Sequence, residues 1–201
     1  ALIRVGDVDE AQAMLEGSGD VTSTVLEAMI ASQRGDADQA RSLLDQAVAQ
    51  SPDHRQARML RAQLLASQPG GSEQAVTDLT DLLADAPDDT RARTMLAELR
   101  LSRGEFDAAA RQYQRILTDQ PENTAARVRL VQALRLDGRV RRALEVAEAG
   151  LRQSPNEPAW HRAVAELAAS LNDYGRAAEA WERTLALDAQ PSDVLQYGQV
   201  L

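Results

Sequence analysis

The feature of this sequence that most constrains its fold is a repeat of about 34 residues. Two residue types recur in steps of 34 or 35 and keep the same phase, alanine at Ala40, Ala75, Ala109, Ala143 and Ala177, and proline at Pro52, Pro87, Pro121 and Pro155. A third series of small residues keeps this phase at Ala28, Ala62, Ala97, Ala165 and Gly198, with Val131 as the one misfit. The spacing predicts a stack of similar units, each of which contacts only its neighbours.

Each unit has the pattern of two helices. Apolar residues at helical spacing between Val21 and Gly35 predict the first helix. Gly35 and Asp36 interrupt this pattern, and Asp38 is predicted to cap the second helix. Pro52 ends the second helix, because proline cannot continue a helix interior.

The repeat resembles the tetratricopeptide repeat. The second helix of that family carries alanine followed four residues later by a large side chain, and the pairs here are Ala40/Leu44, Ala75/Leu79, Ala109/Tyr113 and Ala177/Trp181. The resemblance implies an all-α fold, an α-solenoid in which stacked antiparallel helix pairs form a right-handed superhelix. It also implies a fragment of a longer array, and the alanine-rich, lysine-free composition is typical of a bacterial genome of high GC content.

The domain prediction is a single solenoid over residues 1–201. Its expected parts are a half repeat at 1–20, five full repeats at 21–54, 55–89, 90–123, 124–157 and 158–191, and the start of another at 192–201.

No constellation of residues indicates catalysis. The chain has no cysteine, and its two histidines, His54 and His161, lie three repeats apart, so we expect no catalytic, metal or cofactor site. The net charge of −9 opposes binding of nucleic acid or an anionic membrane. An enzyme or an RNA-binding solenoid is therefore the least favoured interpretation.

The resemblance implies a non-catalytic scaffold for a protein or peptide partner. In the family the first helices line a concave face, and the corresponding positions here are Val25, Met29, Gln33, Met59, Gln63, Ser67, Arg91, Thr94, Glu98, Leu101, Val128, Gln132, Arg135, Arg162, Glu166 and Ser170. The partner-binding candidates are Met59, Gln63, Arg91, Glu98, Arg127, Val128, Gln132, Arg135, Arg139, Arg162 and Glu166.

The fourth repeat holds seven arginines against four acids. One interpretation is a docking patch for a partner with an acidic surface. The other is a solvated helix face whose charges pair locally, for example Arg141 with Glu145. Two tryptophans lie in the next repeat; Trp181 fills a packing position and is predicted to be core, and Trp160 is either core or an interface anchor.

A second functional hypothesis is a spacer or recruitment domain in a bacterial envelope machine. Similar arrays occur in exopolysaccharide and cellulose export, pilus assembly and cytochrome maturation. This resemblance favours the bacterial periplasm over the cytoplasm. We expect no membrane insertion, because no apolar run in the sequence is long enough to span a bilayer.

Overall fold

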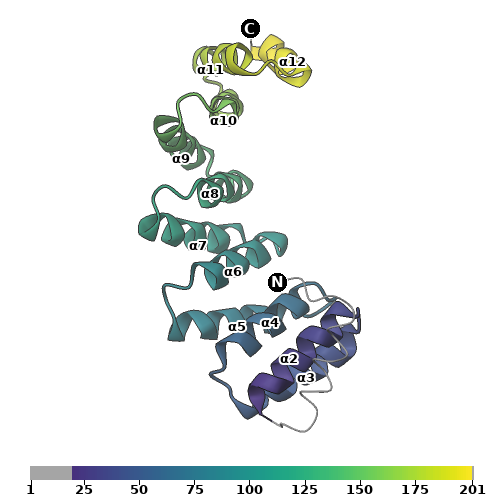
Figure 1. Ribbon diagram of the computed structural model, residues 1–201. Coiled ribbons are helices and arrows are strands. Elements are labelled where there is room, and N and C mark those ends of the chain that lie inside the picture. The colour runs from purple at the N-terminus through teal and green to yellow at the C-terminus, as the bar shows by residue number, and fades with distance from the viewer. Residues whose placement is uncertain (1–19, 201) are drawn as a thin grey trace. The chain divides into compact units, whose positions relative to one another are not determined.

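The computed structural model describes residues 20–200, which form helices joined by short turns (Figure 1). The helices are α2 (Val21–Gln33), α3 (Ala37–Gln50), α4 (Arg55–Ala66), α5 (Ser72–Asp85), α6 (Thr90–Ser102), α7 (Phe106–Asp119), α8 (Thr124–Leu136), α9 (Val140–Gln153), α10 (Pro158–Ser170), α11 (Tyr174–Leu187) and α12 (Pro191–Val200). No strand occurs between residues 20 and 200, so the predicted all-α fold of paired helices is confirmed. The predicted half repeat at 1–20 lies, apart from its last residue, outside the described residues.

The first helices of the first four pairs, α2, α4, α6 and α8, each start at a side-chain cap, whereas Glu157 at the start of α10 makes no such hydrogen bond. Asp20, Asn123 and the His54 ring each accept a backbone N–H three residues on, which satisfies one of the free amides of the first turn. The Asp89 carboxylate accepts the amides of both Arg91 and Ala92. The start of each of these helices is therefore fixed by the residue just before it.

The cap of the second helix in the first repeat differs from our expectation. Asp36, not Asp38, is the N-cap, and its carboxylate accepts the Gln39 amide at 3.1 Å. Gly35 has φ +82°, so the chain reverses at the glycine and the helix begins almost at once. Asp38 instead lies in the first turn, where a negative charge favours the helix dipole.

The turn inside each repeat requires a left-handed backbone. Glycines at positions 35, 70, 104 and 138 have φ between +75° and +82°. In the fifth repeat Asn172 takes this place with φ 61°, since asparagine tolerates the left-handed region better than most residues. Gly35 and Asn172 thus perform the same turn in different repeats.

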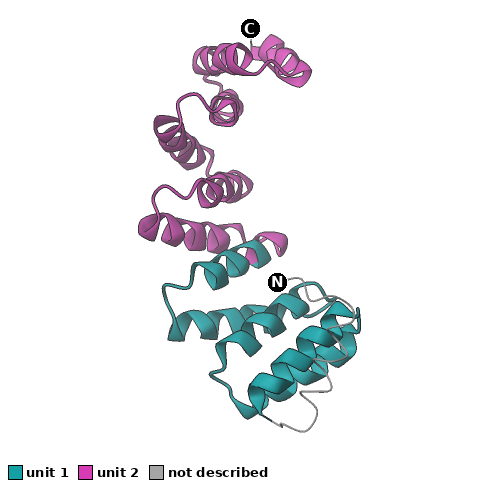
Figure 2. Cartoon of the chain, in the orientation of Figure 1, with its two compact units in different colours: residues 1–99 teal, residues 100–201 magenta. Residues whose placement is uncertain are grey.

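The chain divides into two compact units, residues 1–99 and 100–201 (Figure 2). In unit 1 the larger core cluster consists of aliphatic side chains from α4, α5 and α6, among them Leu65, Leu79 and Leu96. A smaller cluster joins α2, α3 and α4 through Val25, Ala47 and Ala57. The alanines of the repeat are fully buried where helices meet, which permits close approach of the backbones.

The core of unit 2 contains large aromatic side chains. Trp160 and Trp181 are 3% and 2% exposed, which confirms the prediction for Trp181 and decides the open question for Trp160 in favour of the core. Gly150 of α9 makes room for Trp160: a Cβ atom at Gly150 would lie 2.5 Å from the indole ring. The sequence analysis missed this pair.

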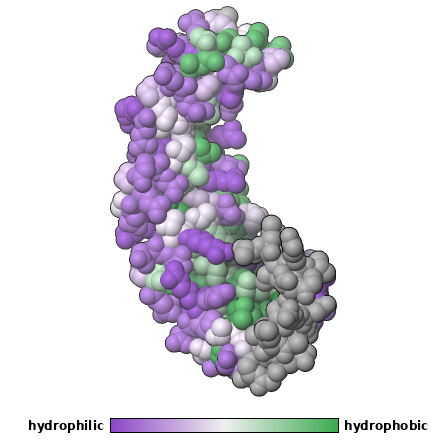
Figure 3. Space-filling view, in the orientation of Figure 1, coloured by the Kyte–Doolittle hydropathy of each residue, from purple (hydrophilic) through white to green (hydrophobic). Residues whose placement is uncertain are grey.

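Hydrophobic side chains are also exposed at the last helix of unit 2. Figure 3 shows them gathered over α12, where Val194 and Leu195 are 53% and 71% exposed. Among the described residues, no helix combines the length and the apolar character that a membrane span requires.

Candidate partner-binding surfaces

Unit 1 contains two adjoining hollows along its first helices. The hollow at α2 and α4 measures about 460 Å³ and is lined by Ala28, Met29, Ser32, Gln33, Leu44, Leu60, Gln63, Leu64 and Ser67. The hollow at α4 and α6 measures about 830 Å³ and is lined by Gln63, Ala66, Ser67, Thr90, Arg91, Thr94, Met95 and Glu98. Gln63 and Ser67 line both hollows. The two hollows therefore form one continuous surface across α2, α4 and α6.

The two hollows differ in chemistry. The α2–α4 hollow has no charged residue in its lining; Met29, Leu60 and Leu64 supply apolar surface, and Gln33 and Gln63 supply carboxamides. The α4–α6 hollow adds one residue of each charge, Arg91 and Glu98. The surface can therefore take up an apolar side chain at one end and a charged or polar one at the other.

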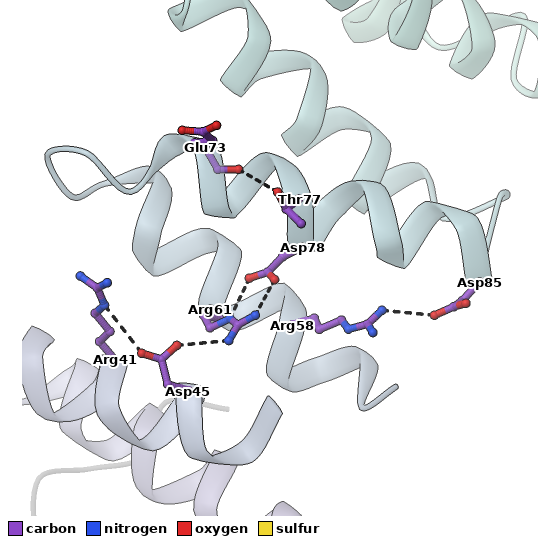
Figure 4. A network of polar contacts seen from close by, with 8 residues as sticks. All are labelled: Arg41, Asp45, Arg58, Arg61, Glu73, Thr77, Asp78 and Asp85. Carbon is purple, nitrogen blue, oxygen red and sulfur yellow. Dashed lines mark hydrogen bonds and ion pairs between the residues drawn. The ribbon is translucent and has the colours of Figure 1, made fainter. Parts of the chain in front are cut away.

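Arg61 holds the helix that the two hollows share (Figure 4). Its guanidinium donates two hydrogen bonds to the carboxylate of Asp78 in α5, with Nη2–Oδ1 at 2.6 Å and Nε–Oδ2 at 2.8 Å. It also reaches Asp45 of α3 at 3.2 Å. The hydrogen bond to Asp78 raises the pKa of Arg61 above its ordinary value. One side chain thus ties α4 to the preceding and the following helix.

A second charged pair connects α4 to the start of α6. Arg55 donates to Asp89 with Nη2–Oδ2 at 2.6 Å, and Asp89 at the same time caps α6. Burial raises the pKa of Asp89, but the bonds from the Ala92 amide and from Arg55 outweigh it, so the pKa lies below its ordinary value. The starts of α4 and α6 are thereby fixed to each other, and both helices carry side chains that line the hollows.

Two of the predicted lining residues face the core. Met59 is 7% exposed and belongs to the core cluster that α5 and α6 complete, and Val25 is 1% exposed against Ala47 and Ala57. Both side chains pack against the neighbouring helices within these clusters. They therefore cannot present a side chain to a partner.

In unit 2, Arg162 and Glu166 lie together at a further hollow of about 580 Å³. Arg162 is already bound to Asp193 of α12, with Nη2–Oδ2 at 2.6 Å and Nε–Oδ1 at 2.9 Å. The bond from Arg162 lowers the pKa of Asp193. Glu166 pairs with Arg135 of α8 at 3.5 Å. Each of the three predicted residues Arg135, Arg162 and Glu166 is therefore already engaged in an ion pair within unit 2.

The arginines of the fourth repeat are mostly engaged in local contacts. Arg127 is buried and donates to Gln153 and to the Pro121 carbonyl oxygen. Arg139 pairs with Asp107 at 3.0 Å and with Asp137 at 3.7 Å. These contacts favour the local-pairing interpretation of the predicted patch.

The other predicted residues of the fourth repeat include both paired and exposed side chains. Glu145 pairs with Arg142, one position from the expected Arg141. Val128 is exposed, and the Gln132 side chain accepts a hydrogen bond from Arg129. Val128 and Arg135 are thus the candidates in this helix whose side chains are exposed to solvent, and Arg135 is paired with Glu166.

Sequence reasoning missed one series of polar contacts. Arg93, Arg127 and His161 each reach the carbonyl oxygen of the proline six residues before them, and the three are spaced by 34 residues. Arg58 holds the corresponding position in the second repeat but pairs with Asp85 at 3.2 Å. The same spacing that revealed the alanines could have revealed this series.

Comparison with known proteins supports the same fold. No curated protein sequence matches the chain. The solved structure of YrrB, described as a TPR protein with an unusual peptide-binding site, superposes with a TM-score of 0.75 at 16% identity, over 94% of this chain and 96% of that one. MamA from Desulfovibrio magneticus RS-1 has a TM-score of 0.70 at 17% identity, over 85% and 96% of the two chains.

Another MamA structure, AMB-1, shares 23% identity with a TM-score of 0.69, over 87% of this chain and 96% of that one. At these identities the likeness shows the fold alone. The tetratricopeptide repeat description matches residues 31–99 and 100–167, which is more than half of the sequence. The chain therefore belongs to the tetratricopeptide repeat family.

Proposed function

We propose that the chain is a non-catalytic scaffold that docks an extended segment of a partner protein in the two adjoining hollows of unit 1. The observation that carries this proposal is the continuity of the surface: Gln63 and Ser67 of α4 line both hollows. Proteins of this fold in general serve protein–protein interaction, and this coarser role agrees with the family.

The chemistry of the hollows suggests how a segment would be held. An extended peptide exposes unpaired N–H and C=O groups, and the carboxamides of Gln33 and Gln63 can both donate to and accept from them. Met29 is 38% exposed, and its flexible thioether side chain can adapt to an apolar side chain of the partner. Arg91 and Glu98 then select for charge further along the segment.

The scaffold itself is suited to docking without a large rearrangement. Arg61 and Arg55 bind buried or half-buried carboxylates on neighbouring helices, so α4 is held on both sides before any partner arrives. A surface that is ordered in advance loses less conformational entropy on binding.

The test is selection of peptides from a phage-displayed random 12-residue library on the purified protein, followed by affinity measurements with two variants. Gln63→Arg places a long charged side chain in both hollows and should abolish binding of the selected peptides. Gln74→Arg makes the same change at an exposed position of α5 outside the hollows and should leave binding intact. Equal binding to both variants, or no selected peptide at all, would contradict the proposal.

The alternative role in an envelope machine rests on the family resemblance. No contact among residues 20–200 favours it over a scaffold elsewhere.

A further inference from the structure

A separate cleft in unit 2 is lined by basic side chains over an apolar floor. It measures about 370 Å³ and lies between residues of α9, α10 and α11. Its lining residues are Glu148, Leu151, Arg152, His161, Val164, Arg176, Glu179, Ala180 and Arg183. None of these residues lines the hollows of unit 1, and only Arg152, one of the seven arginines of the fourth repeat, belonged to a surface predicted from the sequence.

The charges of the cleft are only partly compensated. Arg176 is bound to Glu148. In contrast, neither Arg152 nor Arg183 makes a hydrogen bond or ion pair with any residue of the described part of the chain. Two guanidinium groups thus remain available, while Glu179 is the one acidic residue of the lining that no arginine engages among those described.

Two further side chains, His161 and Arg127, lie at or beside the cleft. The His161 Nε2 lies 2.8 Å from the Pro155 carbonyl oxygen, which can only accept, so Nε2 carries the proton and the ring is anchored in the wall. Burial and then the charge of Arg152 lower the pKa of the neighbouring Arg127. A negative group that entered the cleft would meet the guanidinium groups of Arg152 and Arg183, while Glu148 is already bound by Arg176.

The floor of the cleft is apolar, and it indicates which second group a ligand must carry besides its negative charge. Val164 and Ala180 are buried, and Leu151 is half-buried beside them. Arginine forks bind carboxylates with two parallel hydrogen bonds, and an apolar floor gains from contact with an aliphatic side chain. The cleft therefore fits a carboxylate and an aliphatic side chain that are close together in one ligand.

We propose that this cleft binds an acidic segment of a partner protein in which glutamate or aspartate alternates with aliphatic residues. The carboxylates of such a segment complement the charges of Arg152 and Arg183. A nucleic acid is the less suitable ligand, because the apolar floor of Leu151, Val164 and Ala180 has no counterpart along a phosphate backbone. This site is independent of the hollows in unit 1.

The test uses a fluorescein-labelled octapeptide of alternating glutamate and leucine, with a glutamine–leucine octapeptide as the uncharged control. Fluorescence anisotropy should show saturable binding of the first peptide and binding at least about tenfold weaker of the second, since a charged hydrogen bond is lost with each carboxylate. Arg152→Gln combined with Arg183→Gln should weaken binding of the acidic peptide about tenfold or more.

The matched control is Arg141→Gln combined with Arg115→Gln, which removes the same charge from exposed positions of unit 2 outside the cleft. It should change the affinity less than about twofold at 0.15 M salt, where distant charges are screened. The proposal is overturned if both double variants lose affinity equally, if the two peptides bind equally well, if the acidic peptide does not bind, or if a single-stranded RNA competes it away.

Discussion

The two units of this protein are built from different side chains. All six aromatic residues lie in residues 100–201, and all four methionines lie in residues 1–99. Residues 1–99 hold 8 of the 22 basic and 17 of the 31 acidic residues, a net charge of −9, while residues 100–201 hold 14 of each. The same repeat can thus be stabilised in different ways.

In unit 1 the helices are tied by buried or half-buried ion pairs, and Arg61 connects three of them. In unit 2 large rings fill the core, and the backbone yields to them at Gly150. The repeat thus fixes where helices meet in both units. The side chains at these helix contacts decide which substitutions each unit tolerates.

The largest expected effect is loss of the Arg61 side chain in unit 1. Arg61→Met leaves the carboxylate of Asp78, which is 5% exposed, without its partner. Stranding a buried charge costs about 3 kcal/mol of unfolding free energy. Chemical denaturation followed by circular dichroism measures it. Arg41→Met, which removes an exposed partner of Asp45, should cost less than about 1 kcal/mol, and similar losses in both variants would contradict the buried role of Arg61.

The corresponding substitution in unit 2 is Gly150→Ala. In most helices this change is stabilising, because alanine has the higher helix propensity. Here the added methyl group would overlap the Trp160 ring and should cost about 2 kcal/mol. Tryptophan fluorescence during chemical denaturation measures this loss of stability in unit 2, because both tryptophans lie in that unit.

Gly175→Ala is the matched control, since nothing lies within 4 Å of a Cβ atom at that position of α11. It should leave stability unchanged or raise it by up to about 1 kcal/mol. A gain at Gly150 as well would show that the ring is not in contact with the helix backbone.

Acid should affect both units through depressed carboxylate pKa values. The pKa values of Asp89 in unit 1 and Asp193 in unit 2 lie below the ordinary value of 3.8. Each therefore contributes stability above that value, and the contribution is lost as the pH falls through the lower pKa of the folded state. Urea midpoints measured between pH 6 and pH 2.5 should fall at the acid end. Asp89→Asn should make this fall shallower, and an unchanged slope would contradict the assignment.

The smallest expected effect concerns the turn that both units share. Gly35→Ala in unit 1 forces a Cβ atom into the left-handed region and should cost about 1 kcal/mol. Asn172→Gly in unit 2 relaxes the same conformation and should gain a few tenths of a kcal/mol, partly offset by the greater freedom of glycine when unfolded. Thermal denaturation of the two variants should shift in opposite directions; a shift in the same direction would show that the turns are not equivalent.

The sequence predicted the helix pairs well, because alanine and proline recur at positions where only small side chains or helix ends fit. Trp181 was placed correctly because it occupies a packing position of the repeat. Met59 was placed on the partner-binding face by the family resemblance, but its side chain is buried in the core cluster, because a correspondence of positions does not show which side chains the neighbouring helices cover. The sequence placed Arg152 in an arginine-rich repeat but did not join it with Arg183, because the two belong to different repeats and to no shared period.

The central claim, that the hollows of unit 1 bind a partner segment, is tested most directly by nuclear magnetic resonance of ¹³C-methyl-labelled methionine. Met29 lines the first hollow, Met95 lines the second, and Met59 is buried as an internal control. On titration with a library-selected peptide, the Met29 and Met95 methyl signals should shift together while that of Met59 stays nearly fixed. Saturable binding that leaves Met29 and Met95 unmoved would contradict the account.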